Sequence, residues 1–249
     1  LNYNAIRSEN LDWNINFNAT LNQNKITKLT RVNDPSYVGA QVGGIGGGSG
    51  NTIQINSVGY AANSFYVLQQ KYENGKPLEG QYEDRNGDGQ INERDYYRTQ
   101  QPAPKVYLGL SSNLTWHRFT AAFTARANVG NYVYNNINSD RGTYNGTFPS
   151  QPFLFGAVPS IYATGFRAPQ YFSDYYLEKA SFVRLDNVTL GYDFGALLKE
   201  GTSLRLTLAG QNLLTLTKYS GLNPELPSGI DNNFYPLPRT LTLGLNVSF

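Results

Sequence analysis

The chain has 249 residues, of which only 15% are charged, and its formal net charge is +2. Charged residues usually make up about a quarter of a globular sequence, so this chain is poor in them. Without a cluster of Lys and Arg, so small a net charge gives no support to nucleic acid as a partner. The absence of cysteine excludes a disulfide framework and a thiolate metal site.

Aromatic residues make up 14% of the chain and include 19 Tyr. Many Tyr and few charges fit a membrane barrel with a wet interior and aromatic girdles. No run of about 18 apolar residues is present, which excludes a helical membrane span. The chain has no Met and no signal peptide, and Leu1-Asn-Tyr-Asn reads as the tail of a strand or loop already under way. We therefore expect a C-terminal piece of a longer chain.

Within the predicted strand 239–249, residues 240–249 alternate between apolar side chains and small or polar ones. Successive side chains of a strand point to opposite faces, so one face here is wholly apolar and the other small and polar. A strand of about ten residues, apolar towards lipid and polar towards a lumen, is what an outer-membrane barrel requires. The apolar face consists of Leu241, Leu243, Leu245, Val247 and Phe249.

The same period of two recurs upstream, and no segment of comparable length shows the 3.6-residue period of an amphipathic helix. The pattern predicts an all-β fold, namely a transmembrane antiparallel β-barrel with seven strands in this chain, or eight. The further predicted strands are about 11–22, 105–116, 118–131, 182–195 and 203–213.

The predicted connections alternate between short turns and long loops. Turns fall at His117 and at 195–201, whereas the loops at about 75–103, 132–180 and 214–238 are long. Outer-membrane barrels have short periplasmic turns and long extracellular loops, so we assign these loops to the exterior. Counting strands backwards places segment 31–58 on the periplasmic side, unless Thr52–Val58 forms an extra strand.

The sharpest local motif lies between Asp84 and Asp95. It offers oxygen ligands at loop positions 1, 3, 5, 7, 9 and 12, with a glycine at position 6, as a calcium-binding loop does. The final ligand is Asp instead of the usual Glu, and no helices flank the loop, so a structural clamp is expected. The alternative is a polar turn with solvated acids. The predicted Ca²⁺ ligands are Asp84, Asn86, Asp88, Asn92 and Asp95, with Gln90 contributing its backbone carbonyl.

Other patterns give little support to catalysis or nucleotide binding. The glycine-rich stretch 43–50 lacks the Gly-Lys-Ser/Thr ending of a phosphate loop and precedes no helical pattern. The single histidine, His117, lies in a predicted turn, which is a poor place for a catalytic triad. The spacing of the acids does not favour a glycosidase pair. We expect that the protein is not an enzyme.

Clusters of aromatic residues occur in the predicted exterior loops. Aromatic faces beside Asn and Asp could stack on sugars or grip an extended peptide, or they could pack the loops together or form the outer girdle. The candidate ligand-contacting residues are Tyr132, Tyr134, Tyr175, Tyr176 and Tyr235.

Several segments, taken in order, resemble SusC/RagA-type TonB-dependent outer-membrane transporters. The resemblance runs over most of the chain from about residue 60 and is dense from 170 to 249. The matching segments are the Asn-Gly-Asp-Gly stretch within 82–95, Pro104-Lys-Val-Tyr-Leu-Gly, 176–192, Gly210-Gln-Asn-Leu-Leu-Thr, Lys218-Tyr-Ser-Gly-Leu-Asn-Pro-Glu, Tyr235-Pro-Leu-Pro-Arg-Thr and the final strand.

The resemblance implies that residues 1–249 are the C-terminal part of a barrel of about 22 strands with a plugged lumen. It further implies a plug and a TonB-contacting segment upstream of Leu1, and a SusD-like surface lipoprotein as partner. Its implied activity is TonB-dependent import of an oligosaccharide or peptide through the outer membrane, across a lumen that polar side chains such as Arg126 keep hydrated.

Two other classes stay open at the level of sequence. One is a self-contained outer-membrane barrel of eight strands with a structural or adhesion role. The other is a soluble secreted β domain with a calcium loop. The unbroken Leu, Val and Phe face argues against the soluble class, because such a face needs either lipid or a second protein layer to cover it.

Overall fold

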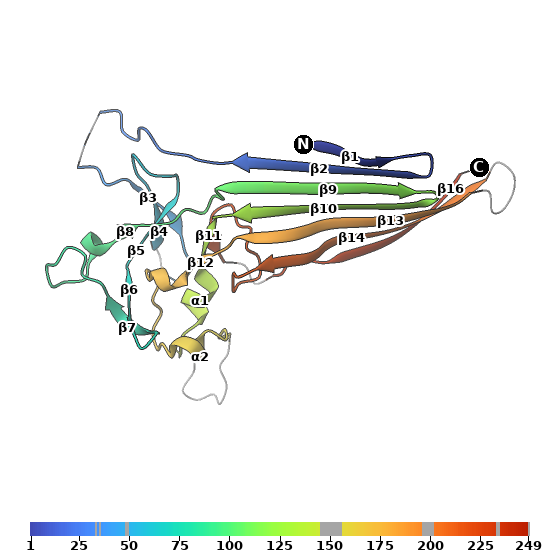
Figure 1. Ribbon diagram of the computed structural model, residues 1–249. Coiled ribbons are helices and arrows are strands. Elements are labelled where there is room, and N and C mark those ends of the chain that lie inside the picture. Colours follow the sequence, from blue (N-terminus) through green and yellow to red (C-terminus); the bar gives the residue numbers. More distant parts are fainter. Residues whose placement is uncertain are drawn as a thin grey trace.

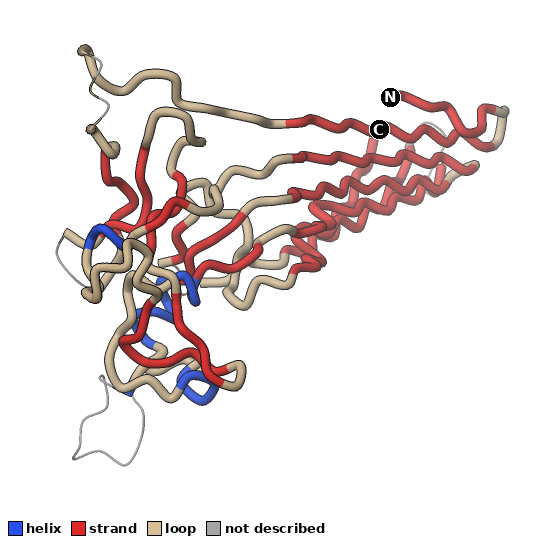
Figure 2. The backbone as a smooth tube through the Cα atoms, turned by 60° about the vertical axis from the view of Figure 1, so that its left-hand side comes forward, coloured by secondary structure: helices blue, strands red, loops and turns tan. Residues whose placement is uncertain are grey.

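The computed structural model describes residues 1–32, 34, 36–47, 50–144, 156–195, 202–232 and 235–248. Seven antiparallel strands form one curved sheet, and the other elements gather beyond one end of it (Figures 1 and 2). We call the sheet the wall and the gathered part the loop domain. The order in the wall is β1 (Asn2–Arg7), β2 (Leu11–Leu21), β9 (Val106–Trp116), β10 (Phe119–Val129), β13 (Phe182–Gly195), β14 (Ser203–Thr217) and β16 (Thr240–Ser248).

The period-two segments all form strands of the wall, which confirms the predicted β fold. Strand β14 runs on to Thr217, so residues 214–217 are wall and not part of the predicted loop 214–238. Strand β1 is the additional wall strand, at the place where the sequence indicated the tail of a strand or a loop. Among the described residues, no helix is long and apolar enough to cross a membrane.

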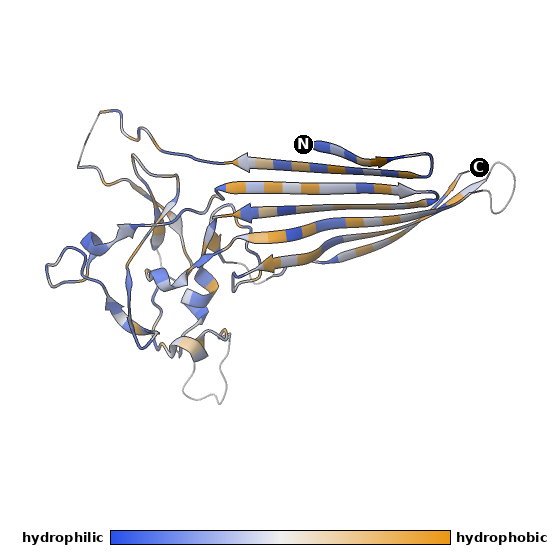
Figure 3. Ribbon diagram, in the orientation of Figure 1, coloured by the Kyte–Doolittle hydropathy of each residue, from blue (hydrophilic) through white to orange (hydrophobic). Residues whose placement is uncertain are grey.

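The register of the wall places like side chains in rows. One row crosses all seven strands through Ile6, Trp13, Leu114, Ala121, Leu190, Leu208 and Leu243. The next row is polar or small throughout and runs through Asn4, Asn14, Asn113, Ala122, Thr189, Ala209 and Thr242. Figure 3 shows the resulting alternation of colour along each wall strand.

The apolar face of the wall has no second layer of described chain over it. Val183 is 50% exposed and Leu208 is 46% exposed, although both lie on strands paired on both sides. In a soluble sandwich these side chains would be buried between two sheets. The described residues thus lack the second layer that a soluble sandwich would place over this face.

The β9–β10 turn is a two-residue hairpin. His117 has a φ of +49°, which matches the twist of tight hairpins and occupies the first central position. The single histidine thus serves as a turn residue. The turn between β9 and β10 lies at the end of the wall opposite the loop domain (Figure 1).

Strand β2 pairs directly with β9, and this pairing decides where the intervening chain lies. The two strands are antiparallel neighbours, so the connection 22–105 leaves and re-enters the wall at the loop-domain end. The predicted periplasmic placement of 31–58 is therefore wrong. Residues Thr52–Asn56 do form a strand, β4, but it belongs to a four-stranded sheet of the loop domain and adds nothing to the wall.

The loop domain is built from all three long connections. Its buried cluster takes Phe65 and Val67 from the first connection, Tyr134 and Tyr176 from the second, and Ile230 from the third. The predicted loops are thus one packed unit. Its elements are β3 (Ala40–Gly44), β4 (Thr52–Asn56), β5 (Ser64–Val67), β6 (Gln70–Glu73), β7 (Lys76–Tyr82), η1 (Glu93–Asp95), β8 (Tyr97–Arg98), β11 (Tyr132–Asn135), α1 (Asn136–Arg141), α2 (Ile161–Thr164), η3 (Asp174–Tyr176), β12 (Leu177–Lys179) and β15 (Ile230–Asp231).

Candidate functional site

Two arginines of the wall hold one glutamate of the loop domain. Arg126 of β10 and Arg184 of β13 face each other directly in the register, where like charges repel. Glu225 lies between them: its Oε2 is 2.8 Å from Arg126 Nη2 and 2.8 Å from Arg184 Nη1. We call these three residues, together with Asp186, the arginine–carboxylate cluster.

Asp186 completes the cluster because of a break in strand pairing. The register of β13 shifts between Leu185 and Asn187, and Asp186 is the residue left over. Its Oδ2 lies 2.9 Å from Arg126 Nε. The bulge thus brings a carboxylate to the same polar face as the two arginines.

Arg184 is the most enclosed member, since its side chain is only 3% exposed. It also donates to Asn223 Oδ1 at 2.9 Å and to Thr215 Oγ1 at 3.1 Å. Phe182 lies 4.9 Å from the guanidinium carbon. These polar and aromatic partners compensate the cation, as a buried charge requires.

A cavity of about 360 Å³ lies beside the cluster on the polar face of the wall. Glu225 belongs to the connection between β14 and β16. Its bonds to Arg126 and Arg184 show that this connection folds back over the polar face near the loop-domain end. The result is a charged, hydratable recess at the junction of wall and loop domain. Its lining includes Asn18, Ser111, Thr124, Arg126, Asn128, Asp186 and Glu225.

Sequence reasoning placed Arg126 on the polar face but missed its partners. The alternation also puts Arg184 on that face, so the pair of cations was readable from the pattern of two neighbouring strands. Nothing local indicated that Glu225, which is 99 residues from Arg126, would come to lie between them.

Two of the predicted ligand-contacting tyrosines are buried in the core of the loop domain. Tyr134 is 0% exposed and Tyr176 is 2% exposed, with their rings 6.1 Å apart in an edge-on arrangement. The hydroxyl of Tyr134 donates to the carbonyl of Tyr171. Burial raises the pKa of both phenols. These rings pack the loops together, which corrects the prediction that they contact a ligand.

The other three tyrosines keep some exposure. Tyr132 and Tyr175 pack against the same core while remaining partly exposed, and Tyr235 is 79% exposed. Tyr132 and Tyr175 thus lie against one core. Phe234, paired with Tyr235 in the sequence pattern, lies outside the described residues.

The predicted calcium loop is closed by hydrogen bonds to its own backbone. Asp84 accepts from the N–H groups of Gly87 at 2.7 Å and Gly89 at 2.7 Å. Asp95, at the far end of the loop, is 0% exposed and accepts from the N–H of Arg85 at 2.9 Å.

Hydrogen bonding holds the pKa of Asp95 below its usual range. The N–H of Asn92 contributes most, and the Asp84 side chain also takes part. Asp84 and Asp95 therefore converge from opposite ends of the loop. Among the described residues, no three His, Cys, Asp or Glu side chains are grouped to hold a metal, so amide and backbone oxygens would have to complete a Ca²⁺ site.

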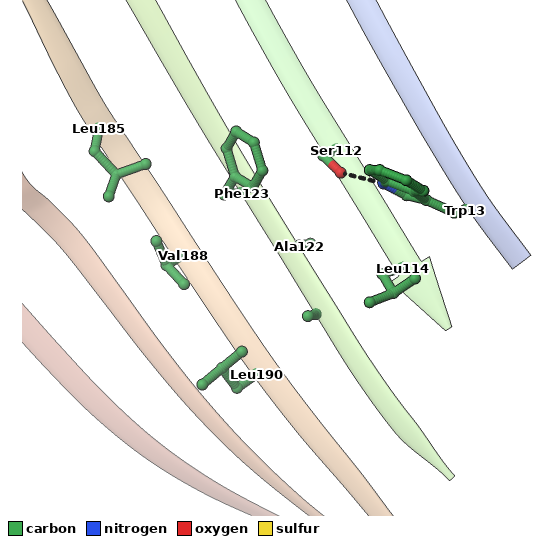
Figure 4. Close-up of a pocket in the computed structure, with 9 residues that line it drawn as sticks. Trp13, Ser112, Leu114, Ala122, Phe123, Leu185, Val188 and Leu190 are labelled. Atoms are coloured by element: carbon green, nitrogen blue, oxygen red, sulfur yellow. Dashed lines mark hydrogen bonds between the residues drawn. The ribbon is translucent and has the colours of Figure 1, made fainter. Parts of the chain in front are cut away.

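A shallow hollow lies between larger side chains on the apolar face of the wall (Figure 4). Ser112 is polar, yet it lies in this hollow among Leu114, Phe123 and Val188. The indole N–H of Trp13 donates to Ser112 Oγ at 2.9 Å. This bond gives the indole N–H an acceptor that lipid could not supply, which suits a lipid-facing surface.

Comparison with known proteins places these features in one family. The chain is 40% identical to the TonB-dependent receptor SusC of Bacteroides thetaiotaomicron, in an alignment that covers all of this chain and 26% of SusC. It is 28% identical to the TonB-dependent receptor P3 of Formosa agariphila, again over its full length. Over its whole length the chain is therefore similar to a portion of the SusC/RagA-type TonB-dependent receptors. No family model matches it.

The fold of this chain also matches that of solved structures. The RagAB peptide transporter matches all of this chain with a TM-score of 0.73 and 25% identity. The match covers 28% of that transporter chain, and the present chain spans about a quarter of the length of its curated relatives. The wall is therefore part of a receptor β-barrel, and the resemblance inferred from sequence is confirmed.

Proposed function

We propose that this chain supplies part of the wall and the exterior loops of an outer-membrane importer driven by TonB. The observation that carries the proposal is the 40% identity to SusC along the entire chain. The polar rows of the wall support it, because they offer hydrogen-bonding groups along a lumen. The uncovered apolar face supports contact with outer-membrane lipid.

In this proposal the ligand is held between the loop domain, the plug and a lid protein. TonB would pull on the plug, using the inner-membrane proton gradient, and open a route along the polar face. Asn14, Asn113 and Thr189 line that face and would exchange hydrogen bonds with a passing solute. The arginine–carboxylate cluster would keep the third connection against the wall during this movement.

The proposed partner is a SusD-like lipoprotein seated over the loop domain. Support comes from the similarity to the RagAB transporter and from the packing of three connections into one unit, which gives a partner a defined surface. The proposed ligand is an oligosaccharide or a peptide. Tyr132, Tyr175 and Tyr235 remain the proposed ring contacts for it.

The function is tested by uptake in the native bacterium. We expect that deletion of the gene for the full-length receptor abolishes growth on one oligosaccharide or peptide source, and that reintroduction of the gene restores it. Affinity purification of the full-length receptor should bring down a lipoprotein. Growth unchanged on every source tested, with no lipoprotein recovered, would contradict the proposal.

We also propose that the loop 84–95 binds Ca²⁺ as a structural clamp. Isothermal titration of the full-length receptor should give a dissociation constant of about 10⁻⁴–10⁻³ M, the range of extracellular calcium modules. Asp84→Asn should weaken binding, because it removes a charged ligand. Glu73→Gln, a change in an exposed acid of the neighbouring β6–β7 hairpin, should leave it unchanged. Absence of binding heat at millimolar Ca²⁺ would refute the clamp.

A further inference from the structure

A polar pocket of about 730 Å³ lies where the wall meets the first connection of the loop domain. It forms beside the point at which β2 ends and the chain returns to β9. Sequence reasoning assigned no site here, because the lining comes from four separate stretches. These are Leu21–Asn24, Gly59–Ala61 with Ser64, Arg98–Gln101 and Lys105.

The pocket holds two cations and no acid. Arg98 and Lys105 both line it, whereas none of its lining residues is Asp or Glu. Within the described part of the chain, the ion pairs involve Arg126, Arg141 and Arg184 and neither of these two cations. Two positive charges in one recess without a carboxylate raise the local concentration of anions and favour an anionic ligand.

Arg98 is fixed in place by neutral groups. Its Nε donates to Ser57 Oγ at 2.8 Å and its Nη2 donates to the Val38 carbonyl at 2.6 Å. Tyr60 and Tyr66 lie 5.0 and 5.4 Å from the guanidinium carbon. The side chain is therefore pre-ordered while its charge stays uncompensated, and Nη1 has no acceptor among the described residues. A ligand carboxylate could pair with it at little entropic cost.

The aliphatic part of the Lys105 side chain packs against Gly130. A Cβ on Gly130 would come within 3.2 Å of Lys105 Cγ, so the absence of a side chain there lets the lysine stem lie close. Gly130 also has a φ of +84°, which favours glycine independently. The Lys105 residue is exposed, and its ammonium remains available to a ligand.

The rest of the lining suits a hydroxyl-rich molecule. The amides of Gln23 and Gln100 have no side-chain hydrogen bond within the described residues, and Asn22 uses only its Nδ2, towards the Pro104 carbonyl. Tyr60 is 48% exposed at the pocket and presents a ring surface. Amides that pair with hydroxyls and a ring that packs on C–H groups are the usual contacts of a sugar.

An extended peptide fits this lining less well. Peptides commonly add a strand to a free backbone edge. Here the backbone is already paired: Ile26 donates to the Tyr60 carbonyl at 2.8 Å, and Asn22 donates to the Lys105 carbonyl at 2.8 Å. The recognition groups that remain are side chains.

We propose that this pocket binds an acidic sugar unit of an oligosaccharide ligand. The carboxylate lies between Arg98 and Lys105, the sugar ring packs on Tyr60, and the hydroxyls bond to the amides. This inference rests on the proposed import function and narrows its substrate class to oligosaccharides that carry a carboxylate.

The test measures binding of trigalacturonate to the purified full-length receptor by isothermal titration, with neutral galactotriose and a triaspartate peptide as comparisons. Trigalacturonate should bind most tightly and weaken as salt is added. Lys105→Gln should weaken it about tenfold, as expected for the loss of a charge-assisted hydrogen bond. Arg98→Lys should also weaken it, since lysine lacks the planar fork. Lys76→Gln, in the exposed turn of the β6–β7 hairpin, should have no effect.

Lys105 is exposed, so its variant keeps the fold and the test does not depend on Arg98. Equal binding of trigalacturonate by the wild type and Lys105→Gln would overturn the inference. Preference for galactotriose or triaspartate would overturn it as well. Uptake separates this failure from that of the importer: growth on a neutral glycan or a peptide that needs the receptor but is unaffected by Lys105→Gln would leave the importer standing and refute the acidic pocket.

Discussion

Glu225→Ala is expected to lower the free energy of unfolding by up to about 3–5 kcal/mol, because it leaves Arg184 buried without its carboxylate. The Arg184 side chain is 3% exposed, so water cannot replace the lost partner. Arg126 would retain its ion pair with Asp186, whose Oδ2 is 2.9 Å from Arg126 Nε, so its charge would remain compensated. Urea unfolding of the full-length receptor in detergent measures the change.

A double-mutant cycle separates the cluster from simple loss of a side chain. The double variant Arg184→Ala/Glu225→Ala should lose less free energy of unfolding than the sum of the losses in the two single variants. Once Glu225 is gone, replacing Arg184 removes a buried charge that has lost its partner. Glu73→Ala, in the exposed β6–β7 hairpin, is the matched acid and should change stability by less than about 0.5 kcal/mol. Additive effects at Arg184 and Glu225 would contradict the coupling.

Leu190→Arg is expected to destabilise the receptor in a bilayer by about 1–3 kcal/mol. A cation on the lipid face costs about 2–4 kcal/mol at the midplane and less towards the interfaces, and Leu190 pairs with Ala121, two residues from the start of β10. Leu190 lies on β13 in the apolar row and is 38% exposed in the structure. No described residue covers it fully, and in the proposed importer lipid would do so. Folding into vesicles, followed by urea titration, gives the difference.

Thr189→Arg is the matched control, one residue earlier on the same strand. Thr189 belongs to the polar row, so its replacement should face the lumen and remain hydrated at little cost. A large penalty at 189 with none at 190 would reverse the assignment of the two faces. Equal small penalties would mean that neither face contacts lipid.

The arginine–carboxylate cluster also explains how the loop domain is attached to the wall. Asn131 Nδ2 donates to the Pro224 carbonyl at 3.1 Å, next to Glu225. Further along, Tyr134 donates its backbone N–H to the Gly229 carbonyl at 2.8 Å. The third connection is therefore joined both to the wall and to the core, and loss of Glu225 should loosen all of it.

The sequence by itself determined the wall. Alternation is a local property of an extended backbone, so the faces of β2, β9, β10, β13 and β14 could be read residue by residue. The same rule places Leu243 of β16 on the apolar face, opposite Leu208. Family membership was also readable, because it rests on short ordered segments.

Only the tertiary structure decided how the connections pack. Tyr134 and Tyr176 read as exposed loop aromatics, yet contacts from three distant segments bury them. Segment 31–58 was placed on the wrong side because the strand count assumed a wall strand between residues 58 and 75, whereas β5 and β6 pair within the loop domain. Glu225 between two arginines, and Arg98 beside Lys105, likewise depend on chain segments that meet only after folding. The alternation of a strand depends only on neighbouring residues. The partners of a loop side chain depend on contacts between distant segments, which no local pattern encodes.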